Sequence, residues 1–185
     1  MAVALLLSME LGAMSVSTQG LVPHQASGEL RVTDPALHFL TGKSLALLHD
    51  GAAAPFDFQL TVASGWKTNV VARSLERFMV SYDVWEEKFS VVRVSDFRKS
   101  SMRLSASSAE TWCLDNIFVP AAALPGGQQL WAHLEIRSVE SREPLAASSG
   151  INLATLIEIF SRPSRPEQDH WSAESAPFQV ASLKP

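Results

Sequence analysis

Alternation of apolar and polar residues with a period of two is the feature that most constrains the fold of this chain. Residues 56–62 read Phe-Asp-Phe-Gln-Leu-Thr-Val. The same alternation recurs in four further segments, namely 28–33, 78–85, 89–94 and 130–137. It predicts strands that bury one face and expose the other to water. We therefore expect an α+β fold, mainly an antiparallel β-sheet in a sandwich-like or two-layer arrangement, with two or three short helices.

Turn and cap residues connect these strands. The polar stretch 86–88 (Glu-Glu-Lys) between two alternating segments predicts an antiparallel hairpin. Asp34-Pro35 suits the N-cap and first position of a helix over 36–49, which Gly51 would end in the left-handed conformation.

Two further segments have helical character. Ser107 and Glu110 have the spacing of a capping box, which predicts a short helix through Leu114. The apolar run 151–160 fits either a helix or a strand, because runs this short do not distinguish the two.

The length of 185 residues favours one domain. We expect a signal peptide or a disordered N-terminus over 1–17 and a globular α+β domain over 18–160. Residues 161–185 carry four prolines and are predicted to be a loop-like tail packed on the domain.

The N-terminus determines the expected location. Residues 1–14 are mostly apolar and too few to span a bilayer, and they resemble the centre of a secretory signal. Small residues follow at the positions that a cleavage site requires, although Glu10 interrupts the run and no cation precedes it. We expect a periplasmic or secreted protein; the alternative is an ordinary N-terminus and a cytoplasmic location.

The order of the segments is also informative. The Asp34-Pro35 start is followed by 45–51 (Leu-Ala-Leu-Leu-His-Asp-Gly), 55–60, 77–83, 124–127 (Leu-Pro-Gly-Gly), 131–137 and 171–175. Over residues 28–180 this order resembles a bacterial cell-envelope family of unknown function, some of whose members are encoded beside nitrogen-regulatory sensor kinases. The Trp- and Arg-rich stretch of many members is reduced here to residues 65–67 (Gly-Trp-Lys). The resemblance implies an envelope domain and no catalytic residue.

Charge and cysteine content exclude several classes of protein. The net charge of −4 argues against a nucleic-acid binder, which should be basic. A single cysteine, Cys113, excludes an intrachain disulfide and a multi-cysteine metal site. We expect no cofactor and no metal.

Three polar residues share one face of a predicted strand, since side chains two positions apart point the same way: His133, Glu135 and Arg137. They fit a solvated face. They also leave open a small hydrolase or isomerase that uses His133 with a carboxylate.

Two other groups suggest surfaces. Trp85 and Trp131 lie on the polar faces of their strands, so pairing of those strands would give an exposed aromatic surface, unless helices cover it. The basic run of Arg93, Arg98, Lys99 and Arg103 predicts either a solvated loop or a patch for anionic lipid or a polyanion.

These observations together predict a non-enzymatic extracytoplasmic domain that binds a partner protein or an apolar ligand through a sheet face. The expected binding residues are Trp85, Trp131, His133, Glu135 and Arg137. An envelope protein is the expected partner, a peripheral membrane contact is the second expectation, and no nucleic acid is expected. The pattern specifies no oligomeric state.

Overall fold

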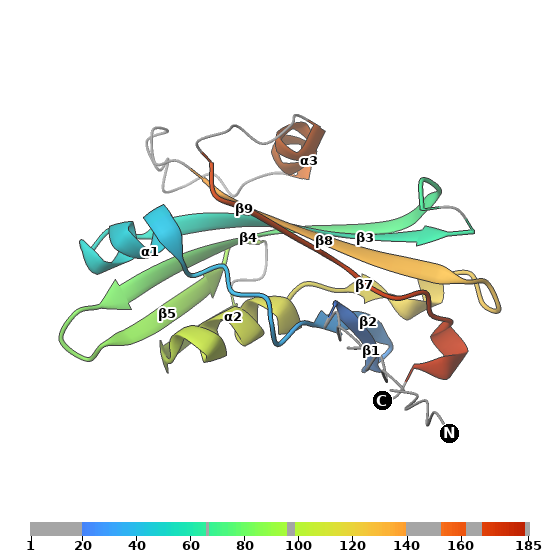
Figure 1. Ribbon diagram of the computed structural model, residues 1–185, viewed down its shortest axis with the longest axis horizontal. Helices are drawn as coiled ribbons and strands as arrows, with labels where there is room; N and C mark the ends of the chain where they lie inside the picture. The colour runs from blue at the N-terminus through green and yellow to red at the C-terminus, as the bar shows by residue number, and fades with distance from the viewer. Residues whose placement is uncertain (1–19, 66, 96–98, 140–152, 162–167, 184–185) are drawn as a thin grey trace, which may run out of the picture.

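The computed structural model describes residues 20–65, 67–95, 99–139, 153–161 and 168–183. Within them, two antiparallel sheets and three α-helices form the layers seen in Figure 1. The predicted α+β class with a mainly antiparallel sheet is confirmed. The predicted signal segment 1–17 lies outside the described residues.

The larger sheet has six strands in the order β6-β5-β4-β3-β8-β9. Their bounds are β3 (Ala54–Ser64), β4 (Val70–Asp83), β5 (Lys88–Arg93), β6 (Lys99–Leu104), β8 (Leu130–Ser138) and β9 (His170–Glu174). The predicted hairpin is the β4–β5 pair, in which Asp83 and Lys88 stand opposite each other.

The smaller sheet has the order β1-β2-β7. Its strands are β1 (Val22–Ala26), β2 (Glu29–Thr33) and β7 (Val119–Pro120), and a 3-10 turn, η1 (Ala121–Ala123), follows β7. Ser27 and Gly28 both have positive φ, 53° and 79°, as the two-residue turn of a tight hairpin requires.

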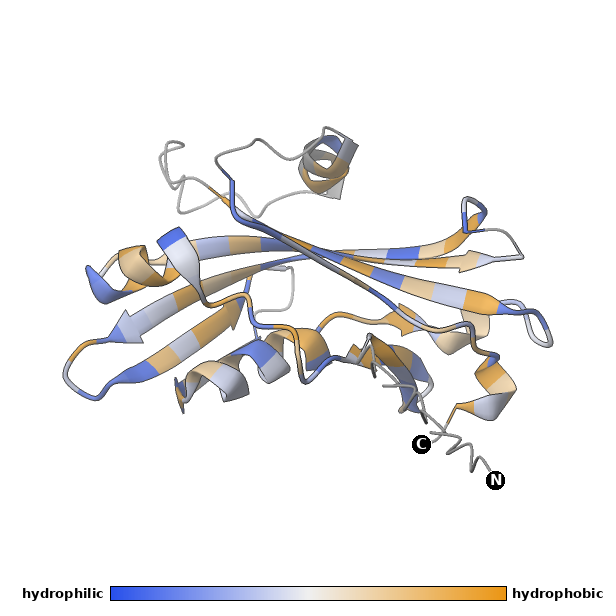
Figure 2. Ribbon diagram, viewed as in Figure 1, coloured by the Kyte–Doolittle hydropathy of each residue, from blue (hydrophilic) through white to orange (hydrophobic). Residues whose placement is uncertain are grey.

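The apolar positions of the alternating strands form the core. Phe56 and Phe58 of β3 and Phe78 of β4 are fully buried, and Phe39 packs edge-on against the two β3 rings. Helix α1 (Gly42–His49), helix α2 (Ala106–Asp115) and the smaller sheet cover this side (Figure 1). Figure 2 shows apolar and polar residues alternating along the long strands.

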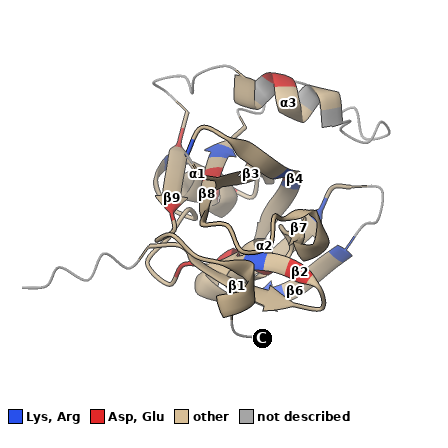
Figure 3. Ribbon diagram, turned by 90° about the vertical axis from the view of Figure 1, so that its right-hand side faces the viewer, with Lys and Arg blue, Asp and Glu red and all other residues tan. Residues whose placement is uncertain are grey.

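The other face of the larger sheet carries polar side chains and lies beneath helix α3 (Leu153–Ser161). The run 151–160 therefore contains a helix. Leu156 is buried, and the ring of Phe160 lies 4.9 Å from the guanidinium carbon of Arg137 on β8. Figure 3 shows α3 on one side of the sheet and α2 with the smaller sheet on the other.

The prediction of one wet face was wrong for the middle of the sheet. Asp57 is 0% exposed and Gln59 is also buried, although both occupy the polar positions of β3. β3 lies between β4 and β8, and α3 covers the polar face. A strand in this central position has little contact with water on either side.

The predicted start of the first helix was wrong. Residues 36–41 form an irregular connection that follows a turn at Pro35-Ala36, and α1 begins at Gly42 after the N-cap Thr41. Asp34 accepts a hydrogen bond from the backbone N–H of Ala36 at 3.0 Å without starting a helix. The predicted end was correct, because Gly51 has a φ of 81°.

The loop-like tail was wrong for residues 170–174, which form β9 at the edge of the larger sheet. Trp171 connects this strand to the core. Its ring packs against Phe39 and Phe56, with centroids 6.3 and 6.2 Å apart. A short 3-10 turn, η2 (Val180–Ser182), follows. None of the described helices is both long and apolar enough to cross a membrane.

Candidate functional site

His133, Glu135 and Arg137 lie on the polar face of β8, as their spacing predicts. In the antiparallel register of β8 and β3, they stand opposite Thr61, Gln59 and Asp57, respectively. The expectation that this face is solvated was wrong for Arg137, which is buried. These residues are therefore part of an enclosed polar layer beneath α3.

Ion pairs use most of the charge in this layer. Arg77 of β4 binds the carboxylate of Asp57 through Nε and Nη2. Burial raises the pKa of Asp57, while the hydrogen bonds and the charge of Arg77 oppose that rise. Glu135 Oε1 accepts from Arg137 at 2.7 Å and contacts Nε2 of His170 at 3.0 Å. The charges hold β4, β3, β8 and β9 together.

His133 is the most exposed of the three predicted residues on β8. Its Nδ1 lies 3.7 Å from Oε1 of Glu174, an ion-pair contact that is too long for a hydrogen bond. A hydrogen bond from Lys67 lowers the pKa of Glu174. Nδ1 of His133, Oγ1 of Thr61 and Oε1 of Gln59 are buried atoms with no hydrogen-bond partner.

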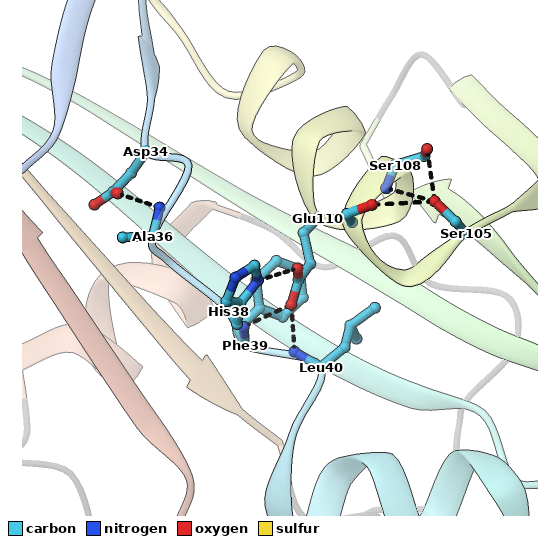
Figure 4. A network of polar contacts seen from close by, with 9 residues as sticks. Asp34, Ala36, His38, Phe39, Leu40, Ser105, Ser108 and Glu110 are labelled. Atoms are coloured by element: carbon cyan, nitrogen blue, oxygen red, sulfur yellow. Dashed lines mark hydrogen bonds and ion pairs between the residues drawn. The ribbon is translucent and has the colours of Figure 1, made fainter. Parts of the chain in front are cut away.

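The most complete polar network lies on the opposite side of the sheet, around Glu110 of α2 (Figure 4). Glu110 is 4% exposed. Its Oε1 accepts the backbone N–H groups of Phe39 and Leu40 at 2.8 and 2.9 Å. Its Oε2 lies 2.9 Å from Nδ1 of His38. We call Glu110, His38 and the two N–H groups the Glu110 network.

The Glu110 network replaces the predicted capping box. The N-cap of α2 is Ser105, whose Oγ accepts the N–H of Ser108 at 3.2 Å, so the N-cap lies two residues before the predicted Ser107. Glu110 is thereby placed in the second turn of α2, where its carboxylate faces the 36–41 connection. Two backbone donors that no helix or sheet satisfies are bound in this way.

The network also alters two neighbouring groups. The hydrogen bond and the charge of Glu110 raise the pKa of His38, whose side chain is 59% exposed. Burial, assisted by the charge of Glu110, raises the pKa of the Cys113 thiol well above its usual value. Cys113 is fully buried. A high thiol pKa and full burial are properties of an unreactive cysteine.

The structure separates the two tryptophans that were expected to form one surface. Trp85 lies in the turn between β4 and β5, and Trp131 is half-buried on β8 opposite Ala63. Their strands do not pair, because β3 lies between them. Trp131 stands opposite Ala63 of β3, and the β4–β5 turn lies beyond Ala54 at the other end of that strand. The two tryptophans are therefore about 30 Å apart along the sheet, at about 3.3 Å per residue.

Trp85 instead belongs to a different surface. Seven large apolar side chains are exposed among the described residues, and four of them are at the end of the molecule where β4 turns into β5. We call these four the hairpin-end surface: Leu47, Val84, Trp85 and Met102. Trp85 is 97% exposed and Met102 is 73% exposed.

Two contacts bring these residues to the same end. His49 of α1 stacks on Tyr82 of β4 with ring centroids 4.6 Å apart, which places α1 beside the turn. Arg103 of β6 donates to both carboxylate oxygens of Glu86, at 2.9 and 2.5 Å. Figure 1 shows α1 and the β4–β5 turn at the same end of the molecule.

A bulge in β6 exposes Met102. Phe89 pairs with Leu104 and Val91 with Ser101, so Met102 and Arg103 stand opposite the single residue Ser90. Arg103 has a φ of 61°, as the extra residue of a bulge often requires. The bulge directs Arg103 to the turn.

Two of the four residues of the predicted basic patch are in ion pairs. Arg93 is paired with Glu76 and stacks on Phe118, and Arg103 is paired with Glu86. Lys99 is exposed, and Arg98 lies outside the described residues. Figure 3 shows the cations distributed over several elements rather than gathered on one.

The amino-acid pattern does not indicate the roles of Glu110, Leu47 and Met102. The capping-box spacing drew attention to Glu110 but assigned it a local role. Leu47 and Met102 gave no signal, because one apolar residue in a helix or an edge strand is ordinary. Among the described residues, no group of three or more His, Cys, Asp or Glu side chains has the arrangement of a metal site.

The polar layer and the Glu110 network thus connect elements of the fold, whereas the side chains of the hairpin-end surface are exposed to water. Comparison with protein-family models, curated proteins and solved structures found no match.

Proposed function

We propose that this chain is a non-enzymatic binding module that engages a partner protein through the hairpin-end surface. The observation that carries the proposal is the 97% exposure of Trp85 on a turn that is fixed by its own hydrogen bonds. Tryptophan is mostly buried in folded proteins, and it is enriched among the residues that dominate binding energy. An indole in water at a rigid position is therefore suited to a partner's pocket.

The other exposed residues support this proposal. Leu47, Val84 and Met102 come from three separate segments and gather at the same end of the molecule. Exposed apolar side chains are ordinary when they are scattered and informative when they are grouped. The binding surface proposed here lies at the end of the sheet and not on the sheet face that the sequence suggested.

Differential capture tests the proposal. The tagged full chain and its Trp85→Ala, Met102→Ala and Val22→Ala variants would be crosslinked in the cells that make the protein, and captured proteins quantified by mass spectrometry. Val22 is the matched control, because it is exposed on β1, away from the turn. We expect Trp85→Ala to reduce recovery of a partner at least tenfold, as for a hot-spot residue. Equal recovery by all four proteins would reject the function.

We also propose an extracytoplasmic location, periplasmic or secreted, on the basis of the apolar N-terminal run. Intact-mass measurement of the protein from fractionated cells tests it. A product lacking about 15–20 residues is expected if the signal is removed. A full-length product in the cytoplasm would contradict it.

A hydrolase or isomerase that uses His133 is the second candidate. The 3.7 Å contact between His133 Nδ1 and Glu174 gives this histidine a carboxylate neighbour, and its ring is partly exposed. A carboxylate can orient an imidazole for general-base catalysis. A screen of ester, amide and glycoside substrates with the His133→Ala variant decides this candidate. Activity that survives the substitution would remove it.

A further inference from the structure

The β4–β5 turn carries two chemically different exposed groups within three residues of the chain. The indole of Trp85 is 97% exposed and makes no ring contact among the described residues. Glu87, two positions later, is exposed and has no ion pair within the described part of the chain. The turn therefore exposes an aromatic ring and a carboxylate. Within the described residues, no other ring contacts the first and no cation pairs with the second.

The same turn is held in a fixed shape. Oδ1 of Asp83 accepts the N–H groups of Trp85 and Glu86 at 2.9 and 3.0 Å. Glu86 is held by Arg103, and Glu87 has a φ of 54°. The backbone that carries Trp85 and Glu87 loses little entropy on binding, because it is already ordered.

We propose that the hairpin-end surface receives a basic segment of a partner protein, in which an arginine stacks on Trp85 and pairs with Glu87. This inference rests on the proposed function and specifies the chemistry of its partner. A guanidinium over an indole gains a cation–π attraction, and a carboxylate beside it adds a charge-assisted hydrogen bond. Leu47, Val84 and Met102 would contact apolar residues between the cations.

Charge complementarity favours this occupant over a membrane. Three carboxylates lie within two positions of Trp85 in the chain, whereas Lys88 is the nearest cation in sequence: Asp83, Glu86 and Glu87. Arg103 and Lys88 offset two of these three carboxylates, so the turn keeps one excess negative charge. Anionic lipid headgroups would be repelled, since they attract basic segments.

A pair of defined peptides tests the proposal on the full chain. The probes are an acetylated eight-residue peptide of alternating leucine and arginine, and its counterpart with glutamate in place of arginine. Binding is followed by the NMR signal of the Trp85 indole N–H, which the Trp85→Phe variant assigns. We expect the arginine peptide to shift this signal in a saturable way and the glutamate peptide to leave it unchanged.

Two matched variants separate the turn from general attraction to an acidic protein. Glu87→Gln removes the proposed partner of the arginine, and Asp115→Asn removes one carboxylate at the end of α2, where the backbone carbonyl of Asp115 accepts a hydrogen bond from Arg31 of β2. We expect Glu87→Gln to weaken peptide binding about fivefold and Asp115→Asn less than twofold. Circular dichroism of both variants establishes that they are folded.

Three results would overturn the proposal: equal binding of the glutamate peptide, equal weakening by the two variants, or transfer of the Trp85 indole into phosphatidylglycerol vesicles. The failure of this inference differs from the failure of the proposed function. If Trp85→Ala abolishes partner capture while the arginine peptide gives no shift, only the basic character of the partner is wrong. If Trp85→Ala leaves capture intact, the function itself is wrong.

Discussion

At Glu110 a charged side chain is 4% exposed with both carboxylate oxygens in hydrogen bonds, whereas at Trp85 an indole is 97% exposed at a tip. Each side chain is in the environment that is energetically unfavourable for it: the carboxylate of Glu110 is buried, and the indole of Trp85 is in water. The cost at Glu110 is offset within the chain by three donors. At Trp85 nothing among the described residues offsets it, so the comparison directs the search for function to the exposed apolar end.

The largest expected effect would break the Glu110 network. Glu110→Ala leaves the N–H groups of Phe39 and Leu40 buried without acceptors, so we expect a loss of about 3–5 kcal/mol in the free energy of unfolding. Glu110→Gln keeps an acceptor oxygen and should lose only about 1 kcal/mol. Urea unfolding measures both. Equal losses would show that the carboxylate's hydrogen bonds do not stabilise the connection.

Removal of Arg77 from its ion pair with Asp57 extends the comparison to a second buried carboxylate. Arg77→Ala leaves the carboxylate of Asp57 buried without its cation, with an expected loss of about 3–5 kcal/mol near neutral pH. The double variant Asp57→Asn/Arg77→Ala should recover part of that loss, because no charge then remains unpaired.

The pH dependence of the Arg77→Ala variant provides a further check. Burial raises the pKa of Asp57 even with Arg77 present, so removal of the Arg77 guanidinium should raise the pKa of Asp57 further. Because the folded-state pKa is raised, the contribution of Asp57 to the free energy of unfolding is fully present below the ordinary pKa of 3.8. That contribution is lost as pH rises through the folded-state pKa. A flat difference from the wild type between pH 4 and 7 would contradict this.

One substitution at two sites sharpens the contrast between a half-buried and an exposed tryptophan. Trp171→Ala removes a ring that packs on Phe39 and Phe56, and we expect a loss of about 2–3 kcal/mol. Trp85→Ala removes a ring with no such contacts, and the expected change is within about 0.5 kcal/mol. Thermal unfolding of the two variants measures the difference. A large loss for Trp85→Ala would assign that residue to the fold.

The last expected effect is also small and concerns His38, at the solvent side of the Glu110 network. The pKa of His38 is raised, so its contribution to stability is fully present below its ordinary value of 6.5 and is lost as pH rises through the folded-state value. The imidazole is largely exposed, so the change should be below about 1 kcal/mol. His38→Asn should flatten the stability profile between pH 6 and 8. An unchanged profile would mean that the pairing does not depend on charge.

Period-two alternation was sufficient to predict β3, β4, β5 and β8, because a long strand with one apolar side has few other ways to bury it. Residues 34–41 show where this local reading fails. Asp34-Pro35 is a good helix start, yet the following backbone donors are bound by Glu110, seventy residues away in sequence. Sequence spacing contains no information about such a contact.

The candidate site shows the same division. The exposure of the turn that follows Asp83 could be expected from its polar residues, and Trp85 was singled out for its position. Its assignment with Trp131 failed because strand order, which determines neighbours in a sheet, is not encoded in the period of any one strand. Leu47 and Met102 joined the surface only through the stacking of His49 on Tyr82 and the bulge in β6.

The sequence by itself determined the α+β class, the main hairpin and the strands β3 and β8, since each follows from local pattern and side-chain chemistry. The tertiary structure alone decided which charges turn inward, that β9 completes the sheet, and which apolar side chains remain outside. The physical reason is that burial is a property of the packed whole: an exposed leucine or a buried glutamate is defined by the elements that cover it.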